Sequence, residues 1–275
     1  MRKPFFSVIL PIYNSISFLK KNLKSIFNQT FKDFEIIIID NYSNDGSYEY
    51  IKKIKKKNLV YSRINNKGII AKSRNLGIKI SKGKWLAFID SDDIWFKKKL
   101  EVFYKELKKY EKSDIVSSLF NITENNKIIY VHRFKYKDNF YENLLVKGNC
   151  FSTSSTIVRK KFLNNHKILF NEKKSLATVE DYDLWLNIVK QGGKISLIKE
   201  VLTSHTMRTD SMSNSLLHFI NYLSVIKIHI FNNKNNFKIK YLIYLILFLR
   251  NFLRIIKFII KNKVIFFIFY TFKKN

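Results

Sequence analysis

The chain has 275 residues and carries 51 Lys and Arg against 21 Asp and Glu, a formal net charge of +30. This length suits one large domain, or one domain with an appendage. The single cysteine, Cys150, excludes an internal disulfide and a cysteine-based zinc site. The first residues, MRKPFFSVILPIYN, do not form a signal peptide, because Pro11 interrupts their short apolar stretch and no small-residue cleavage site follows. We therefore expect a cytoplasmic protein.

Short apolar runs and amphipathic stretches alternate in the first part of the chain. The apolar runs predict strands at Phe6–Ile12, Phe34–Ile39, Leu59–Ser62 and Trp85–Ile89. Apolar residues at helical spacing predict helices between them, at Ser15–Phe27, Ser47–Lys57 and Ala71–Ile80. This alternation is typical of an α/β fold with an open, mostly parallel sheet flanked by helices.

The middle of the chain is less regular. We expect a basic helix at Lys97–Tyr110, a turn at Asn121–Asn126, and strands at Asp114–Leu119, Lys127–His132 and Ser154–Arg159. The stretch TVEDYDLWLNIVKQGG predicts a further helix. Thr178 is its expected N-cap, and Gly192 and Gly193 are expected to stop it.

The composition changes at residue 216. From there to the end the chain has no Asp or Glu but eleven Lys or Arg, which interrupt the apolar runs 241–249, 252–260 and 264–272. No run reaches the roughly 18 apolar residues of a membrane span. We expect a folded domain over 1–215 and a basic helical extension over 216–275 that lies on an anionic membrane surface. Helices that pack on the domain with their lysines in water are the alternative.

Polar residues follow three predicted strands where each strand ends. They are Pro11 to Asn14, Asp40, and the triplet Asp90-Ser91-Asp92. The carboxyl ends of parallel strands share one edge, so we expect these residues to line one crevice. Two carboxylates spaced as in the triplet can face one divalent cation, and Mg²⁺ needs only one or two when phosphate oxygens complete its shell. A strand-end turn with capping acids explains the triplet equally well.

Other polar residues have a structural and a functional interpretation. Glu180 and Asp181 are first-turn acids that the helix dipole favours, or they include a general base. Arg74 pairs with a surface acid, or it binds a diphosphate through its bidentate fork. The five histidines show no metal-ligand spacing, and we interpret them as structural or exposed.

Taken in order, five motifs resemble the family 2 glycosyltransferases with the GT-A fold. They are SVILPIYN (7–14), FEIIIIDNYSNDGS (34–47), AKSRNLGI (71–78), GKWLAFIDSDD (83–93) and VEDYDLW (179–185). The resemblance implies a catalytic domain over 1–215, a nucleotide-sugar donor, and a divalent cation, Mn²⁺ or Mg²⁺. It also implies a single displacement that inverts the anomeric carbon.

The resemblance further implies roles for individual residues. Asp181 would be the catalytic base, with Glu180 beside it, and Asp92 would hold the metal on the donor diphosphate. The nucleotide-sugar-binding residues would be Pro11, Tyr13, Asn14, Asp40, Arg74, Asp90 and Ser91.

Two stretches depart from the family pattern. Asn41 stands where relatives often carry a second acid, so base or ribose contacts would differ. In HTMRTDSMS (205–213), Arg208 takes the place of the usual His, and we expect Arg208 to contact phosphate.

Together with the basic extension, the resemblance implies a glycosyltransferase that extends a lipid-linked glycan in bacterial lipopolysaccharide, capsule or O-antigen synthesis. It would work as a peripheral protein on the inner face of the cytoplasmic membrane. A nucleotidyl- or phosphotransferase also uses acidic metal sites, but no Gly-rich phosphate loop follows the first strand. A sequence pI near 10.0 favours a nucleic-acid binder. Acids at the strand ends would repel a phosphate backbone, so we expect no nucleic-acid partner.

Overall fold

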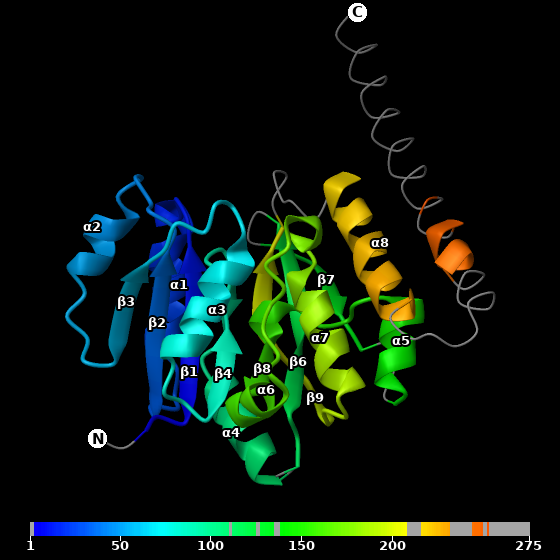
Figure 1. The fold of residues 1–275 in the computed structure, drawn as a ribbon. Coiled ribbons are helices and arrows are strands. Elements are labelled where there is room, and N and C mark those ends of the chain that lie inside the picture. Colours follow the sequence, from blue (N-terminus) through cyan, green and yellow to red (C-terminus); the bar gives the residue numbers. More distant parts are fainter. Residues whose placement is uncertain are drawn as a thin grey trace, which may run out of the picture. The chain divides into compact units, whose positions relative to one another are not determined.

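The computed structural model describes residues 3–109, 112–124, 127–134, 138–207, 216–231, 244–249 and 252. It divides into two compact units, Met1–Ser211 and Met212–Asn275. The first unit contains the sheet with its flanking helices, and the second contains helix α8 (Leu216–Phe231) (Figure 1). The expected α/β fold is therefore confirmed, and the described residues of the C-terminal extension are helical.

The N-terminal half of the sheet is parallel. Its strands are β1 (Phe6–Ile12), β2 (Phe34–Asp40), β3 (Leu59–Arg63) and β4 (Trp85–Phe88), in the spatial order β3-β2-β1-β4. Every residue of β1, β2 and β4 is buried, which explains why these strands appear in the sequence as continuous apolar runs. The connecting helices are α1 (Ile16–Phe27), α2 (Ser47–Lys52) and α3 (Ile70–Ile80).

Helix α3 lies directly against β1. A Cβ atom added to Gly77 would lie 2.5 Å from Cγ2 of Ile9, so only glycine allows the helix to approach this closely. The same helix carries Arg74, whose side chain is almost fully buried. The close contact therefore fixes the height of Arg74 above the sheet.

The second half of the sheet is mixed. Strand β8 (Thr156–Arg159) is antiparallel to both β4 and β6 (Ile115–Glu124), and β9 (Ile195–Thr206) is parallel to β6. The short β5 (Ile94–Trp95) pairs with β9, and β7 (Lys127–His132) pairs with β6. The full order is β3-β2-β1-β4-β8-β6-β9-β5. The sheet is thus open as predicted, with antiparallel pairs concentrated after β4.

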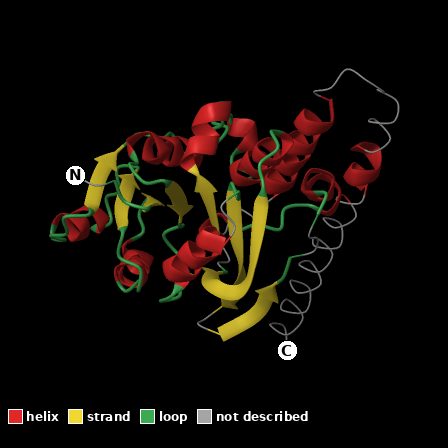
Figure 2. Cartoon of the chain, turned by 90° about the horizontal axis from the view of Figure 1, so that it is seen from below, coloured by secondary structure: helices red, strands yellow, loops and turns green. Residues whose placement is uncertain are grey.

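The helices of this half lie around the sheet, and Figure 2 shows helices on both faces of the strands. They are α4 (Lys99–Lys109), α5 (Phe140–Lys147), α6 (Lys160–His166) and α7 (Glu180–Lys190). Two short 3₁₀ turns, η1 (Thr153–Ser155) and η2 (Lys174–Leu176), precede β8 and α7. Turn η2 lies shortly before Glu180 and Asp181 in the sequence. Turn η1 is distant from them in the sequence, but its Thr153 contacts Asp181.

Three local predictions were wrong. Thr178 is not an N-cap, because α7 begins at Glu180 after Val179, and Thr178 has a left-handed φ of 82°. Helix α2 ends at Lys52, since the lysine-rich stretch after it offers little apolar surface to bury. The predicted turn at Asn121–Asn126 is instead largely the end of β6, which pairs there with β7 and β9.

Among the described residues, no helix combines the length and the apolar character that crossing a bilayer requires. Helix α8 and the helical residues 244–249 belong to the predicted basic extension. The apolar runs 252–260 and 264–272 lie outside the described residues, apart from Phe252. Membrane-surface binding by this extension stays a prediction.

Candidate functional site

The carboxyl ends of β1, β2 and β4 lie together, because β1 pairs in parallel with both neighbours. Ile12 stands opposite Asp40 in the register, and the Asn41 amide donates to the Ile12 carbonyl at 3.0 Å. Across the next strand end, Ser91 Oγ donates to Ser15 Oγ at 3.0 Å. The three predicted polar segments therefore occupy one edge of the sheet.

Asp40 is fully buried and satisfies its hydrogen bonds within the protein. Its Oδ1 accepts from the amide and hydroxyl of Ser43, and its Oδ2 accepts from the Tyr61 hydroxyl at 2.5 Å and Arg63 Nε at 3.2 Å. Burial and the Asp40 charge raise the pKa of the Tyr61 hydroxyl well above its usual value. Asp40 thus organises the loop that follows β2, and Arg63 lies over the Tyr48 ring at 4.0 Å.

The other predicted residues at this edge differ in exposure. Pro11 is buried in β1, whereas the Tyr13 ring is 61% exposed. Asn14 has a left-handed φ of 45°, and its Oδ1 accepts from the Asn44 amide at 2.9 Å. Tyr13 therefore presents an exposed aromatic ring at the end of β1. Arg208 lies outside the described residues.

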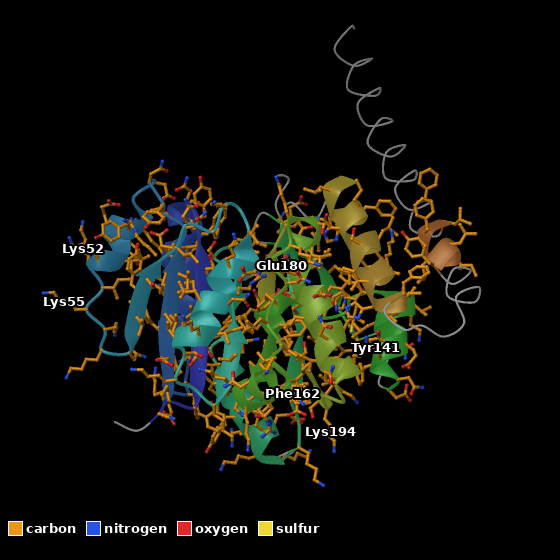
Figure 3. The ribbon with its side chains drawn as sticks, viewed as in Figure 1. Lys52, Lys55, Tyr141, Phe162, Glu180 and Lys194 are labelled. Atoms are coloured by element: carbon orange, nitrogen blue, oxygen red, sulfur yellow. The ribbon has the colours of Figure 1, made fainter. Side chains whose placement is uncertain are left out.

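Arg74 connects the two halves of the site. Its Nη2 donates to Asp90 Oδ1 at 2.7 Å, and its Nη1 donates to Glu180 Oε1. Figure 3 labels Glu180 at the start of α7. Burial disfavours the guanidinium charge, but the Asp90 and Glu180 carboxylates outweigh it and raise the pKa of Arg74. Each terminal nitrogen donates to a carboxylate, so Arg74 acts here as a buried link between Asp90 and Glu180. Donor binding by Arg74 stays a prediction.

The segment after β4 forms a tight turn that carries Asp90, Asp92 and Asp93. The Asp93 amide donates to the Asp90 carbonyl at 3.1 Å, and Nδ2 of the buried Asn22 donates to both the Asp90 and Asp93 carbonyls. Burial, and then the charges of Asp93 and Asp90, raise the pKa of Asp92 to about 6. The Asp92 carboxylate therefore lies where neighbouring carboxylates create an excess of negative charge.

A divalent cation suits this donor set. It would offset the repulsion that raises the pKa of Asp92, and carboxylate oxygens are the ligands that Mg²⁺ and Mn²⁺ prefer. Within the described ranges, no group of three His, Cys, Asp or Glu side chains forms a complete metal cage. Asp92 with Asp90 behind it matches a site completed by phosphate oxygens and water.

Asp181 lies in the first turn of α7, on the other side of Arg74. Its Oδ2 accepts from Thr153 Oγ1 at 3.0 Å, and its Oδ1 accepts from the Tyr182 amide at 2.6 Å. Burial and the charge of Glu180 raise the pKa of Asp181 to about 6, against the opposing effect of Arg74. Glu180 Oε2 is buried and has no hydrogen-bond partner in the part of the chain that the structure describes. The helix start therefore offers two carboxylates with different surroundings.

The sequence gives no sign of an ion pair that lies beside the triplet Asp90-Ser91-Asp92. His205, at the end of β9, lies 3.0 Å from the fully buried Asp93 through its Nδ1, and Asp93 raises the pKa of His205 to about 9. Thr206 Oγ1 also donates to the Asp92 carbonyl at 2.7 Å. The pairing of β9 beside β5 brings these residues together, and the sequence carried no spacing signal for it.

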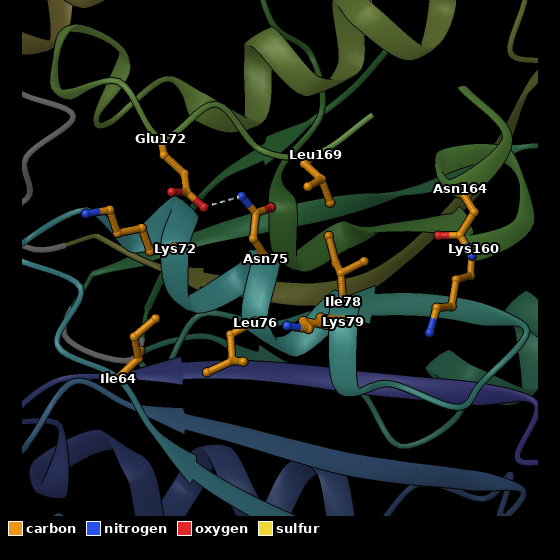
Figure 4. A pocket seen from close by; sticks show the side chains of 10 residues that line it. All are labelled: Ile64, Lys72, Asn75, Leu76, Ile78, Lys79, Lys160, Asn164, Leu169 and Glu172. Carbon is orange, nitrogen blue, oxygen red and sulfur yellow. Dashed lines mark hydrogen bonds between the residues drawn. The ribbon is translucent and has the colours of Figure 1, made fainter. Parts of the chain in front are cut away.

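A separate hollow of about 610 Å³ lies along α3 (Figure 4). Asn75 in its wall donates to Glu172 at 2.9 Å, and Lys72 and Lys79, which also belong to α3, line the hollow as well. None of the predicted site residues lines it. The candidate site is therefore the strand-end edge and the start of α7, and not this hollow.

The comparisons with known proteins identify the family of the chain. The family model described as "Glycosyl transferase family 2" matches residues 7–166. An "Uncharacterized glycosyltransferase" of Methanocaldococcus jannaschii is 32% identical over 233 residues, which cover 82% of this chain and 76% of the relative. The chain spans only 32% of a longer glycosyltransferase of Rickettsia conorii, to which it is 34% identical. The family match thus extends over more than half of the chain.

A relative with a named reaction and a solved structure complete the comparison. The Escherichia coli protein "UDP-Glc:alpha-D-GlcNAc-diphosphoundecaprenol beta-1,3-glucosyltransferase WfaP" is 28% identical, and the match covers 80% of this chain and 85% of WfaP. The structure of S. aureus TarS residues 1–349 with UDP superposes with a TM-score of 0.65 at 24% identity, covering 87% of this chain and 69% of TarS. At that identity TarS shows the shared fold alone. The chain therefore belongs to glycosyl transferase family 2 and has the GT-A fold.

Proposed function

We propose that this glycosyltransferase moves a sugar from a nucleotide-sugar donor to a hydroxyl of a lipid-linked glycan, with inversion and with a divalent cation. One observation carries the proposal. A single buried guanidinium, that of Arg74, contacts both Asp90 of the metal motif and Glu180 beside the candidate base. The donor-side acids and the acceptor-side acids therefore belong to one connected site.

The donor end is expected at the edge formed by β1, β2 and β4. Tyr13 offers an exposed ring there, and Ser91 and Asn14 lie beside it at the ends of β4 and β1. Asp92, with Asp90, would hold a cation on the diphosphate, which when bound stabilises the charge of the leaving group. Similar proteins support a nucleotide-sugar donor: WfaP takes UDP-Glc, and the structure of a Pyrobaculum calidifontis mannosyltransferase, 17% identical to this chain, contains GDP-Man and Mn²⁺.

Asp181 is the proposed general base. A base works best when its pKa lies near the operating pH, and a pKa of about 6 leaves Asp181 mostly ionised at pH 7.5. The acceptor hydroxyl would lose its proton to Asp181 as its oxygen attacks the anomeric carbon opposite the leaving diphosphate. Arg74 donates a hydrogen bond to Glu180 next to it, so a guanidinium lies directly beside the pair of acids at the start of α7.

The acceptor and the location follow from the relatives and the C-terminal extension. WfaP and WfgD, two Escherichia coli relatives, act on GlcNAc linked to diphosphoundecaprenol. A basic extension without acids over 216–275 suits an anionic membrane surface. We therefore place the enzyme on the cytoplasmic face of a membrane, in surface-polysaccharide synthesis.

The first test is donor binding by calorimetry and thermal shift. UDP-, GDP-, dTDP- and CMP-sugars are titrated with Mn²⁺, with Mg²⁺ and with EDTA. We expect one nucleotide class to stabilise the protein in a cation-dependent manner, and we expect Asp92→Ala to lose that effect. Asp138→Ala, which removes an exposed acid from the loop before α5, is the matched control and should keep it.

Turnover then tests the assigned roles. Asp181→Asn should bind the donor normally and lose transfer by about 10²- to 10⁴-fold, the usual contribution of a general base. Near-normal turnover of both Asp92→Ala and Asp181→Asn would overturn the proposed mechanism.

A further inference from the structure

Two consecutive side chains of the η1 turn contact the two acidic motifs of the site. Thr153 Oγ1 donates to Asp181 Oδ2 at 3.0 Å, and Ser154 Oγ accepts from the Asp90 amide at 3.0 Å. We propose that Thr153 is a positioning residue that orients the Asp181 carboxylate, and that η1 sets the spacing between this carboxylate and the metal motif. This inference rests on the proposed role of Asp181.

The turn is built to hold a fixed position. Thr153, Ser154 and Ser155 are between 0% and 5% exposed. The Ser155 amide and hydroxyl both donate to the Ser152 carbonyl at 3.0 Å, which closes the turn. A buried turn with these internal bonds has little freedom to follow a displaced side chain.

Two other strands hold the turn from behind. The Ser154 carbonyl accepts from Trp95 Nε1 of β5 at 2.8 Å and from Thr203 Oγ1 of β9 at 3.3 Å. Both donors are buried. The turn is therefore fixed relative to β5, which follows the triplet Asp90-Ser91-Asp92 in the chain, and relative to β9. Any shift of η1 would disturb Asp90 and Asp181 together.

The contact matters most at Asp181 itself. One of its oxygens is held by the Tyr182 amide, and the other is held by Thr153. Without the hydroxyl the carboxylate keeps one anchor and can rotate about it. A donated hydrogen bond also favours the ionised form of a carboxylate. The charged groups that face Asp181 are Glu180 on its own helix and Arg74 on α3, and neither replaces a neutral donor at Oδ2.

A purely structural threonine is the competing explanation. In that case Thr153 would fill space under α7, and its loss would lower stability without changing the pH dependence of catalysis. The positioning role instead predicts a specific effect on kcat and on the titration of Asp181. The two explanations therefore differ in measurable quantities besides overall activity.

The experiment compares Thr153→Val, which keeps the shape, with Thr153→Ser, which keeps the hydroxyl. It uses the full chain with UDP-glucose, or the donor found by the binding screen, and a GlcNAc-diphospholipid acceptor. We expect Val to lower kcat by about 10- to 100-fold, the usual effect of removing a hydrogen bond to a charged group. The KM for the donor should stay unchanged, the acidic limb of the kcat profile should move to higher pH, and Ser should restore both properties.

A second readout needs no substrate. Loss of the Thr153 hydroxyl should raise the pKa of Asp181 in the folded state further, so the folded state binds this proton more tightly. The free energy of unfolding should therefore fall more, as pH rises from 4 to 7, in Thr153→Val than in wild type. This extra slope should vanish in the double variant with Asp181→Asn. Thr153→Ala serves the same purpose if the valine variant does not fold.

The outcomes separate this inference from the proposed function. Adding Thr153→Val to Asp181→Asn should cause no further loss of turnover, because the hydroxyl acts through the carboxylate. An inactive Asp181→Asn with a Thr153→Val that keeps wild-type kcat and pH profile overturns the inference alone. An active Asp181→Asn overturns the assignment of the base, and the inference with it.

Discussion

Asp90 and Glu180 come from opposite halves of the chain and accept hydrogen bonds from the two terminal nitrogens of one guanidinium, that of Arg74. The side chains of Arg74 and Glu180 are 3% and 6% exposed. Water therefore does little to compensate either charge, and the arrangement depends on the three groups remaining together. A substitution that disturbs this cluster should therefore lower the free energy of unfolding more clearly than it changes the rate of the chemical step.

Replacing Arg74 should destabilise the fold strongly. Arg74→Met leaves Glu180 as a buried charge without its partner, and we expect the free energy of unfolding to fall by about 3–5 kcal/mol. Arg74→Lys should be intermediate, because one ammonium cannot reproduce the bidentate fork. Urea unfolding measures both. Lys105→Met, which removes the exposed pair with Glu101, is the control and should cost about 0.5 kcal/mol or less. Equal losses in the two methionine variants would contradict the buried-link interpretation.

The pH dependence of turnover should report Asp181. The proposed base is active when ionised, and its pKa is about 6, so kcat should rise with pH through about 6 and then level off. A pH profile under saturating donor and cation checks this. A rise of kcat centred near pH 4, close to the ordinary pKa of an aspartate, would show that the base lies in a more solvated site than the structure describes.

Asp181→Asn should stabilise the protein at neutral pH. The pKa of Asp181 is higher in the folded than in the unfolded state, so the folded state binds more protons and stability falls as pH rises from about 4 to about 6. The amide avoids this loss, and we expect a gain of about 1–3 kcal/mol at pH 7.5 that disappears near pH 4. Thermal unfolding of the two proteins across this range provides the test, and a gain that is constant with pH would count against it.

Lys99 should make the stability of the protein fall as pH falls, which is the opposite of the effect of Asp181. Its ammonium is 0% exposed, donates to Thr203 Oγ1 at 2.8 Å and lies over the Trp95 and Phe103 rings. Burial lowers its pKa well below the usual value, although Asp93 opposes the shift. The unfolded state then binds more protons, so stability present above the unfolded pKa of about 10.4 is lost as pH falls.

Lys99→Met tests the direction of this pH dependence of stability. Methionine keeps the length of the side chain without its charge, so the variant should gain stability relative to wild type as pH falls from 10 toward 6. Melting temperatures at several pH values give the comparison. Lys98→Met, at an exposed neighbouring position, should run parallel to wild type throughout. A parallel course for Lys99→Met as well would contradict the shifted titration.

Gly83→Ala should damage the start of β4. A Cβ at this position would lie 2.6 Å from the Ser7 backbone nitrogen and 2.7 Å from the Phe6 carbonyl carbon. Backbone atoms of a central strand cannot move aside as a flexible side chain can, so we expect a loss of about 1–3 kcal/mol or more in denaturant unfolding. Lys84→Ala, at the exposed next residue, should change little. A Gly83→Ala protein as stable as that control would show that β1 and β4 are not so closely spaced.

The sequence was most informative where structure is local. Strands β1, β2 and β4 are buried on both faces and appear as unbroken apolar runs, and the acids that follow them mark the carboxyl edge. Those features predict that Asp40, Asp90 and Asp92 lie on one edge of the sheet. The parallel pairing of β1 with both neighbours then explains why they meet.

The sequence was least informative where contacts are distant. Strand β9, ISLIKEVLTSHT, carries Lys199 and Glu200 at its centre and has no clear alternation, so it was not predicted. Its pairing with β5 and β6 is what brings His205 to Asp93. Thr153 likewise lies in a run of small hydroxyl residues, and only the packing of η1 under α7 distinguishes it from its neighbours.

The strand order β1-β4-β8-β6-β9 has a consequence for how the protein reaches its native state. Pairing Trp85 with Arg159, and Ile115 with Ile195, closes long chain loops and costs more conformational entropy than the pairings among β1, β2 and β3. We expect these closures to come last, so that Asp90 and Glu180 stay hydrated until Arg74 can meet both. Substitutions in this cluster should then accelerate unfolding and leave the folding rate nearly unchanged.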